Sequence, residues 1–465
     1  MSAPLVWILF PLLVALILFG IRKSRKTSVL VGVTFCLLLA ALALVTPINQ
    51  AVKSGLIQFT LPGDFSFLGR ILSLTQQDMP FVAFMFSIGA LWFFLSMDNR
   101  RASLFIPVGL SIIALLIAAL AVKPFIYGAL LIEIAILACI LILADQRNPI
   151  GTGTIRFLVF QSLGMPFLLL AGWFLASGEI TPINQTQLAI SVVLLSLGFA
   201  FWFGVFPLHT WIPMIAEEAE PRISGFIFSI LPMPVMFFLL DFLNSYAWLR
   251  EFPAIYPAFR WLGAVMVLFS GVWGLFQRNI KQVFGYLVMV LSGLSLLVLG
   301  VKGAQGIQIL TYSFLPRLLS IALISTSIFV LLKNKSEMSI ESLQGLAWKA
   351  PFSALGIITA ILATAGMPLL AGFPILQGLE AELFKLSYLS LAMMLGGLFC
   401  IFLTGFKLLT IMFTRPANLA DMKESMTDKL TIGLLVALVL LVGLFPAVFS
   451  YFLSGLAGKF TFLLQ

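Results

Sequence analysis

The sequence predicts an all-α polytopic membrane protein with about 14 transmembrane helices. Of its 465 residues, 61% are hydrophobic and 10% are charged, and the mean hydropathy is +1.13. Soluble proteins are only roughly 45–50% apolar. Because a span needs about 20 apolar residues and the connections in compact bundles are short, spans fill the chain and leave no separate soluble domain.

Apolar runs bounded by charged residues give the order of the spans. The first run is followed by a cluster of Lys and Arg and has no small-residue cleavage site, so we expect it to be retained as a span. Residues 50–78 form the longest interruption, and alternating polarity around Pro62 and Gly63 predicts one short β-hairpin at the membrane surface. The expected spans are 4–21, 28–47, 79–97, 103–122, 124–144, 154–177, 187–209, 222–243, 258–277, 280–301, 306–333, 351–384, 386–414 and 429–455.

The positive charge has a topological role. The 27 Lys and Arg exceed the 18 Asp and Glu, and the excess lies beside apolar runs, which excludes a water-soluble nucleic-acid-binding protein. The odd-numbered connections between spans hold most of the Lys and Arg residues. The first connection, with Arg22, Lys23, Arg25 and Lys26, contributes most to this bias. The positive-inside rule then places both termini on the non-cytoplasmic side. We expect the membrane to be a bacterial-type plasma membrane.

Two spans are expected to be broken. Residues 351–384 are too long for one straight helix and contain Gly366, Pro368, Gly372 and Pro374, which lipid tolerates only where the freed backbone faces protein or water. The span that ends at His209 is a weaker candidate for a helix break. The two breaks lie five spans apart. Because an odd number of spans reverses the direction of a unit in the membrane, this spacing indicates two inverted five-helix repeats. The expected domains are 1–102 (helices 1–3), 103–243 (first repeat), 258–414 (second repeat) and 429–465 (last helix).

Cofactor chemistry is not expected. The three cysteines lie far apart in apolar runs, so they form neither a disulfide framework nor a metal-binding spacing. With a single histidine and no phosphate-binding glycine loop, the sequence predicts no metal, no cofactor and no catalytic residue of its own.

Charged residues inside spans are the candidate functional residues, since each costs about 2.5–3.5 kcal/mol near the bilayer centre. Glu133 lies in the middle of span 124–144. We favour a proton-handling carboxylate over a neutral acid that bonds a neighbouring helix. Arg317 follows Pro316, and its charge requires a carboxylate, carbonyls or water, for either a functional or a structural role.

Three further polar residues lie nearer to span ends. Lys281 and Arg156 are near predicted cytoplasmic ends, so we favour snorkelling over a place in an ion path. His209 lies at the expected break of the seventh span. We favour a hydrogen-bonding fastener over a proton relay there, because only the neutral imidazole is cheap to bury.

Three segments carry a resemblance to a known family. GFAFWFGVFPLHTWIPMIAEEAEPRISG, residues 198–225, resembles the GFA-x-K-x-P-x-x-P-x-H-x-W-x-P-D-A-H stretch of the antiporter-like subunits of respiratory complex I and of Mrp-type cation/proton antiporters. Residues 271–293 are similar to their Q-x-D/N-I-K-R stretch, and AGMPLLAGF, residues 365–373, to their AG-x-P-x-x-x-GF break. The resemblance covers nearly the whole chain.

The resemblance implies a fold and a mechanism. Spans 4–8 and 9–13 would form the two inverted repeats, and protons would cross along buried lysines and a glutamate, driven by quinone chemistry elsewhere in a multi-subunit complex. It places Glu133 at the family's fifth-span glutamate and Arg156 near a basic position of the sixth span. Lys281 matches the lysine of the N-I-K motif.

The departures from the family pattern indicate an interrupted path. The family's seventh-span and eighth-span lysines correspond to Trp202 and Met233, its tenth-span histidine to Leu291, and a charged residue of the twelfth span to Leu376. A proton path needs groups that change protonation within hydrogen-bonding reach or one water apart. Arg317 does not replace them, because a guanidinium keeps its proton.

The expected function is that of an antiporter-like membrane-arm subunit of a complex I-like NADH:quinone oxidoreductase, associated with proton translocation but with a degenerate path. The short segment after the last span and the GMPLLAGF pattern favour subunit N. Two alternatives are a non-pumping structural subunit, and a cation/proton antiporter or bicarbonate-uptake membrane component. Expected partners are other membrane subunits and the lipid bilayer, with quinone only indirectly.

Overall fold

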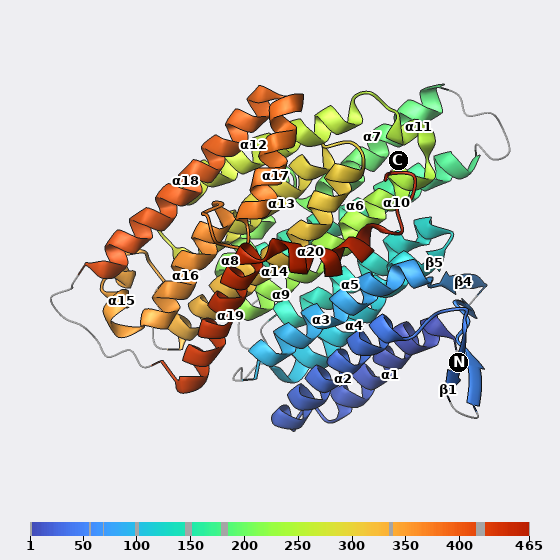
Figure 1. Cartoon of the computed structure of the whole chain (residues 1–465), viewed down its shortest axis with the longest axis horizontal. Coiled ribbons are helices and arrows are strands. Elements are labelled where there is room, and N and C mark those ends of the chain that lie inside the picture. The colour runs from blue at the N-terminus through green and yellow to red at the C-terminus, as the bar shows by residue number, and fades with distance from the viewer. Residues whose placement is uncertain are drawn as a thin grey trace. The chain divides into compact units, whose positions relative to one another are not determined.

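The computed structural model describes residues 2–54, 57–67, 69–97, 102–144, 151–177, 185–333, 338–414 and 424–464. The described chain is mostly helical and divides into two compact units (Figure 1). Unit 1 comprises Met1–Phe203, Ile230–Leu249 and Gly458–Phe460, and unit 2 comprises Gly204–Ser229, Arg250–Ala457 and Thr461–Gln465.

Unit 1 is a bundle whose inner helices are α3 and α4. Most of the side chains of these two helices are buried, whereas α2 presents exposed leucines that suit a lipid environment. The helices of this unit are α1 (Phe10–Gly20, preceded by a π-helical turn Leu5–Leu9), α2 (Arg25–Val45), α3 (Met79–Leu95), α4 (Ala102–Ala121), α5 (Gly128–Leu143), α6 (Thr152–Ser177), α7 (Gln185–Phe203) and α10 (Pro232–Ser245).

The strands correct the expectation of a single hairpin. Strand β1 (Ala51–Ser54) pairs with β2 (Ile57–Thr60), β3 (Asp64–Phe67) pairs with β4 (Arg70–Ser73), and β5 (Val122–Lys123) extends the second sheet. Pro62 and Gly63 lie between the two hairpins. The Pro62 carbonyl accepts from Ala3 N at 2.8 Å, and Gly63 N donates to Asn49 Oδ1 at 2.8 Å. These backbone groups therefore bond other segments instead of closing a turn.

Unit 2 contains the remaining long helices. They pack closely where small residues meet. A Cβ atom added at Gly271 of α12 would lie 2.2 Å from the Gly397 carbonyl oxygen of α18. The helices are α8 (Trp211–Glu218), α9 (Pro221–Ile230), α12 (Ile255–Phe276), α13 (Ile280–Leu299), α14 (Ala304–Leu332), α15 (Leu346–Lys349), α16 (Pro351–Thr364), α17 (Phe373–Leu386), α18 (Tyr388–Phe413), α19 (Met426–Leu444) and α20 (Pro446–Ser454); α11 (Ala247–Arg250) is a single turn at the boundary.

Every expected span has a helical counterpart in the described chain. Among the described residues, twelve helices are long and apolar enough to cross a membrane, or thirteen if one bent pair counts as a span. The first expected span is the shorter helix Leu5–Gly20, and the twelfth is divided between α16 and α17. The eighth span comprises α9 and α10, and the fourteenth is α19 followed by α20. The all-α polytopic architecture is thus confirmed.

Both expected helix breaks are present. In the twelfth span, residues 365–372 separate α16 from α17, and Gly366 and Leu369 have positive φ angles of 82° and 72° (Figure 1). Pro368 has no N–H to continue the helix. In the seventh span, α7 ends at Phe203, and Gly204 has a φ of 60°. The boundaries of the two inverted repeats stay a prediction.

Candidate functional site

Glu133 is buried in α5 and bonds the neighbouring helix. The hydroxyl of Ser162 on α6 donates to Glu133 Oε1 at 2.5 Å. Glu133 Oε2 is buried and has no hydrogen-bond partner within the described part of the chain. Only 8% of the residue surface is exposed. The carboxyl group is therefore bonded through one oxygen and buried without a described partner at the other.

Trp202 occupies the space beside the same helix α6. Its indole Nε1 donates to the Gln161 carbonyl at 2.9 Å, and Gln161 Nε2 donates to the Trp202 carbonyl at 3.2 Å. A Cβ atom at Gly164 would lie 2.3 Å from the indole ring, so the glycine makes room for the large side chain. This reciprocal pair leaves the Trp202 side chain packed and its indole N–H bonded.

Aromatic packing continues towards α10. Trp202 lies with its ring centroid 6.0 Å from that of Phe238, and Phe199 contacts both rings. Met233, the second position at which the resemblance predicts a lost relay group, is also buried in α10. Both of the positions in unit 1 that the sequence predicts as lost relay positions are thus buried.

Arg156 is not part of the Glu133 site. It is exposed on α6, six residues before Ser162, which is about 9 Å along a helix axis. No hydrogen bond or ion pair joins it to Glu133 among the described residues. Its exposure fits the snorkelling interpretation.

In unit 2, Arg317 is buried without a counter-charge. Its Nη1 atom donates to Ser295 Oγ at 3.3 Å and its Nη2 atom to Ser292 Oγ at 3.1 Å, both on α13. Its Nε atom has no partner, and no described acidic side chain forms an ion pair with it. Only 4% of the residue surface is exposed.

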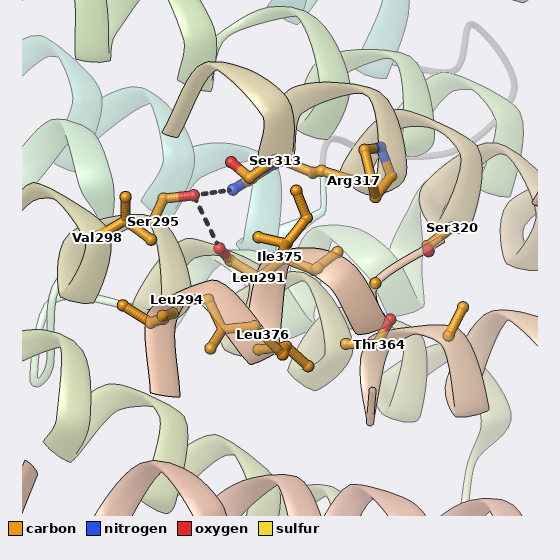
Figure 2. A pocket seen from close by; sticks show the side chains of 14 residues that line it. Leu291, Leu294, Ser295, Val298, Ser313, Arg317, Ser320, Thr364, Ile375 and Leu376 are labelled. Atoms are coloured by element: carbon orange, nitrogen blue, oxygen red, sulfur yellow. Dashed lines mark hydrogen bonds between the residues drawn. The ribbon is translucent and has the colours of Figure 1, made fainter. Parts of the chain in front are cut away.

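Three positions selected from the sequence meet at one cavity. Arg317, Leu291 and Leu376 line a cavity of about 40 Å³ between α13, α14, α16 and α17, at the break of the twelfth span (Figure 2). Its polar lining consists otherwise of the hydroxyls of Ser295, Ser313, Ser320 and Thr364. Among the described lining residues Arg317 is the one ionisable side chain, so the two leucines leave no titrating neighbour beside it.

Lys281 anchors the end of a helix. Its Nζ atom donates to the Glu217 backbone carbonyl in the last turn of α8, and the neighbouring Gln282 donates to Glu217 Oε2 at 2.8 Å. A cation at a helix C-terminus satisfies an unpaired carbonyl and interacts favourably with the macrodipole. Lys281 lies at the start of α13, where Asn279 caps its backbone N–H.

His209 is held by aromatic packing. Its ring stacks on Phe206 at 5.4 Å between centroids and meets Phe269 edge-on at 5.1 Å. Its Nδ1 atom is buried and has no hydrogen-bond partner among the described residues. The ring therefore stiffens the chain between α7 and α8 chiefly through packing, whereas the sequence suggested a hydrogen bond.

Sequence reasoning missed an ionic triad in unit 1. Lys459 Nζ lies 3.4 Å from both Asp78 Oδ1 and Asp241 Oδ2, and 3.4 Å from the Leu120 carbonyl oxygen. Burial lowers the pKa of Lys459, but the two carboxylates outweigh burial and raise its pKa above the ordinary value. Asp241 inside an apolar run was a visible signal, whereas nothing in the sequence marked Asp78 or Lys459.

A second missed cluster lies in unit 2. Asp428 at the start of α19 accepts from Lys333 Nζ at 2.9 Å and from Ser425 Oγ at 2.7 Å. The buried guanidinium of Arg222 lies 3.8 Å over the ring of Phe329. The positive-inside pattern explains the cations, but their pairing depends on helices that are distant in sequence.

Comparisons with known proteins place this chain among membrane subunits. The family described as "NADH:quinone oxidoreductase/Mrp antiporter, TM" matches residues 125–406. NADH-ubiquinone oxidoreductase chain 5 of Loxodonta africana is 28% identical over 239 residues, which are 49% of this chain and 38% of that protein. NADH-quinone oxidoreductase subunit N 1 of Opitutus terrae is 26% identical over 359 residues, 69% of this chain and 66% of that protein. The alignment thus spans about 38% of the length of the chain 5 relatives.

Solved structures show the same fold. The chain superposes on a subunit of the Mrp complex from Dietzia sp. with a TM-score of 0.81 at 13% identity, covering 100% and 99% of the two chains. A chain of an archaeal membrane-bound sulfane sulfur reductase gives a TM-score of 0.83 at 16% sequence identity, and the superposition covers 100% of this chain and 98% of that chain. A chain of respiratory complex I from Thermus thermophilus gives 0.71 at 22% identity, covering 99% of each.

The expected kinship and fold are therefore confirmed, and the protein is a multi-pass membrane protein. Because the family match covers more than half of the sequence, the chain belongs to the membrane family of the NADH:quinone oxidoreductase and Mrp antiporter subunits.

Proposed function

We propose that this chain is an antiporter-like membrane subunit of a complex I-like assembly, and that it supports proton translocation there without a complete proton path of its own. One observation carries the proposal. The cavity at the break of the twelfth span is lined by Leu291 and Leu376, and Arg317 is the one ionisable side chain among its described lining residues.

The chemistry of that cavity supports an interrupted path. A relay group must bind and release a proton at ordinary pH. A guanidinium stays charged, and leucine side chains have no proton to exchange. Water in the cavity could solvate Arg317, but no second titrating group lines the cavity to receive a proton. Arg317 therefore acts as a fixed positive charge.

Unit 1 supports the same conclusion. Trp202 is bonded to Gln161 and packed against Phe238, so no space remains there for a charged side chain. Glu133 keeps one unpaired carboxyl oxygen. We infer that Glu133 exchanges or senses charge locally, and that the resulting field acts on neighbouring subunits.

A matched pair of substitutions in the intact complex tests this proposal. Glu133→Gln removes the acid and keeps its shape, whereas Ser162→Ala removes the bonded hydroxyl and keeps the acid. We expect Glu133→Gln to lower proton translocation per electron transferred while assembly persists, and Ser162→Ala to leave pumping nearly unchanged. Unchanged pumping and assembly in Glu133→Gln would refute a role for Glu133 in translocation.

That last outcome would favour a second candidate, a non-pumping structural subunit. The specific observation in its favour is the buried and internally bonded state of Trp202 and Met233. A subunit that only fills a place in an assembly needs packing and no titrating groups. The subunit would then be required for assembly, so its deletion should remove the intact complex from a native gel.

Transport by the chain alone is the remaining alternative. Purified protein in liposomes with an internal pH dye and an imposed potential should show no proton flux above protein-free vesicles. Flux driven by a sodium, potassium or bicarbonate gradient without a redox partner would favour a cation/proton antiporter or a bicarbonate-uptake component.

We infer that the chain resides in a bacterial-type plasma membrane with both termini outside the cytoplasm. Its partners are other membrane subunits and lipid, and quinone is bound by another subunit. The Lys and Arg that follow α1 support this topology. Reporter fusions at the C-terminus, active only in the periplasm or only in the cytoplasm, test the orientation.

A further inference from the structure

The environment of Arg317 does not balance its charge. A buried guanidinium is stabilised by a carboxylate, by several carbonyls or by water. Arg317 contacts two neutral hydroxyls, Ser292 and Ser295, and these in turn donate to the carbonyls of Val288 and Leu291 at 3.0 Å. Of its five N–H donors, Nε is buried and has no described partner.

The cavity beside this guanidinium has room for a ligand. Its volume is about 40 Å³, and one water needs about 10–15 Å³ by this measure. A small ion with a water therefore fits. Figure 2 shows Arg317 and Ser295 on one side of this space and Leu376 on another.

The break in the twelfth span adds a second source of positive potential. Helix α17 begins at Phe373, and its first-turn residues Ile375 and Leu376 line the cavity. The N-terminus of a helix carries a partial positive charge that favours an anion. In α17 the N–H of Phe373 already donates to the Leu370 carbonyl and Pro374 has no N–H, so the helix end contributes mainly this partial charge. Half-helices in membrane transporters hold anionic groups in this way. No described lining residue is acidic. The last residues of α16, Ala363 and Thr364, also line the cavity, and the negative end of that helix dipole offsets part of the α17 potential, so Arg317 is the main source of positive charge.

We propose that this cavity is a binding site for a small monovalent anion of the size of chloride, with Arg317 as its main ligand. The anion neutralises the guanidinium inside the membrane. The hydroxyl of Ser320 is the second donor offered to the anion. The hydroxyls of Ser313 and Thr364 also line the cavity, but they already donate to the carbonyls of Leu310 and Ala360. The proposal does not depend on whether the subunit supports proton translocation.

A halide-dependent unfolding assay on the purified full-length protein tests the site. Its unfolding midpoint is measured by tryptophan fluorescence with sodium chloride or with sodium gluconate at equal ionic strength. Because a ligand that binds only the folded state stabilises it by mass action, we expect chloride to raise the midpoint and the rise to saturate. The exposed-residue variant Arg156→Gln should keep the full shift.

Two variants distinguish the site from a general salt effect. Arg317→Gln removes the charge and should abolish the chloride shift. Leu376→Glu supplies a fixed carboxylate in the cavity, so it should fold without chloride and also lose the shift. Bromide anomalous scattering from crystals should give a peak beside Arg317. A midpoint that does not respond to chloride, or an equal shift in either variant, would overturn the proposal and indicate a cavity that holds water only.

Discussion

Removing the Lys459 ammonium should destabilise unit 1 much more than removing an exposed lysine. In Lys459→Met, the carboxylates of Asp78 and Asp241 lose the cation that lies 3.4 Å from each of them. Breaking a fully buried pair costs about 3–5 kcal/mol. Because 25% of the Lys459 side chain is exposed, we expect a smaller cost of about 2–3 kcal/mol.

The assay is thermal unfolding in detergent, with Lys385→Met as the matched control. Lys385 pairs with Glu382 at 2.8 Å, but 63% of its side chain is exposed. Its loss should cost less than about 1 kcal/mol. For a cooperative unit of about 150–250 residues, 2–3 kcal/mol lowers the midpoint by roughly 4–12 °C. Equal shifts in the two variants would refute the argument from burial.

The pH dependence gives an independent check. The two carboxylates raise the pKa of Lys459 above its ordinary value of 10.5. The contribution of the charged Lys459 to the free energy of unfolding is therefore fully present below the ordinary pKa. It is lost as the pH rises through the raised pKa of the folded state. The stability difference between wild type and Lys459→Met should therefore not shrink between about pH 7 and about pH 9. A difference that disappears within this window would contradict the triad.

Three further predictions concern helix contacts, each checked by the unfolding midpoint. Trp202→Ala should cost about 3–5 kcal/mol through lost packing, whereas Trp202→Phe should cost only about 1 kcal/mol, mainly from the lost indole bond. Gly271→Ala should cost about 1–3 kcal/mol, because the new Cβ would lie 2.2 Å from the Gly397 carbonyl oxygen; Gly20→Ala, with no atom within 4 Å, should not destabilise the protein. Lys281→Met should cost about 0.5–2 kcal/mol by freeing the end of α8, and an unchanged midpoint would show that this lysine is not an anchor.

Local turn chemistry was the least reliable part of the sequence reading. Pro62 and Gly63 were expected to lie at the turn of one hairpin, but they connect two hairpins. Their backbone groups bond Ala3 and Asn49. These are tertiary contacts, and such contacts override a turn propensity that is worth little on its own.

The sequence by itself determined the all-α membrane class, the order of the apolar helices, the two breaks and the isolated acid Glu133. Each of these follows from local chemistry, because lipid requires long apolar runs and leaves few places for glycine, proline or charge. Only the tertiary structure decided which groups meet. It brought Ser162 to Glu133, closed the Asp78–Lys459–Asp241 triad, and placed Leu291 and Leu376 around Arg317. The physical reason is that such contacts join helices tens to hundreds of residues apart, and no local pattern in an apolar run encodes the helix face that a partner will present.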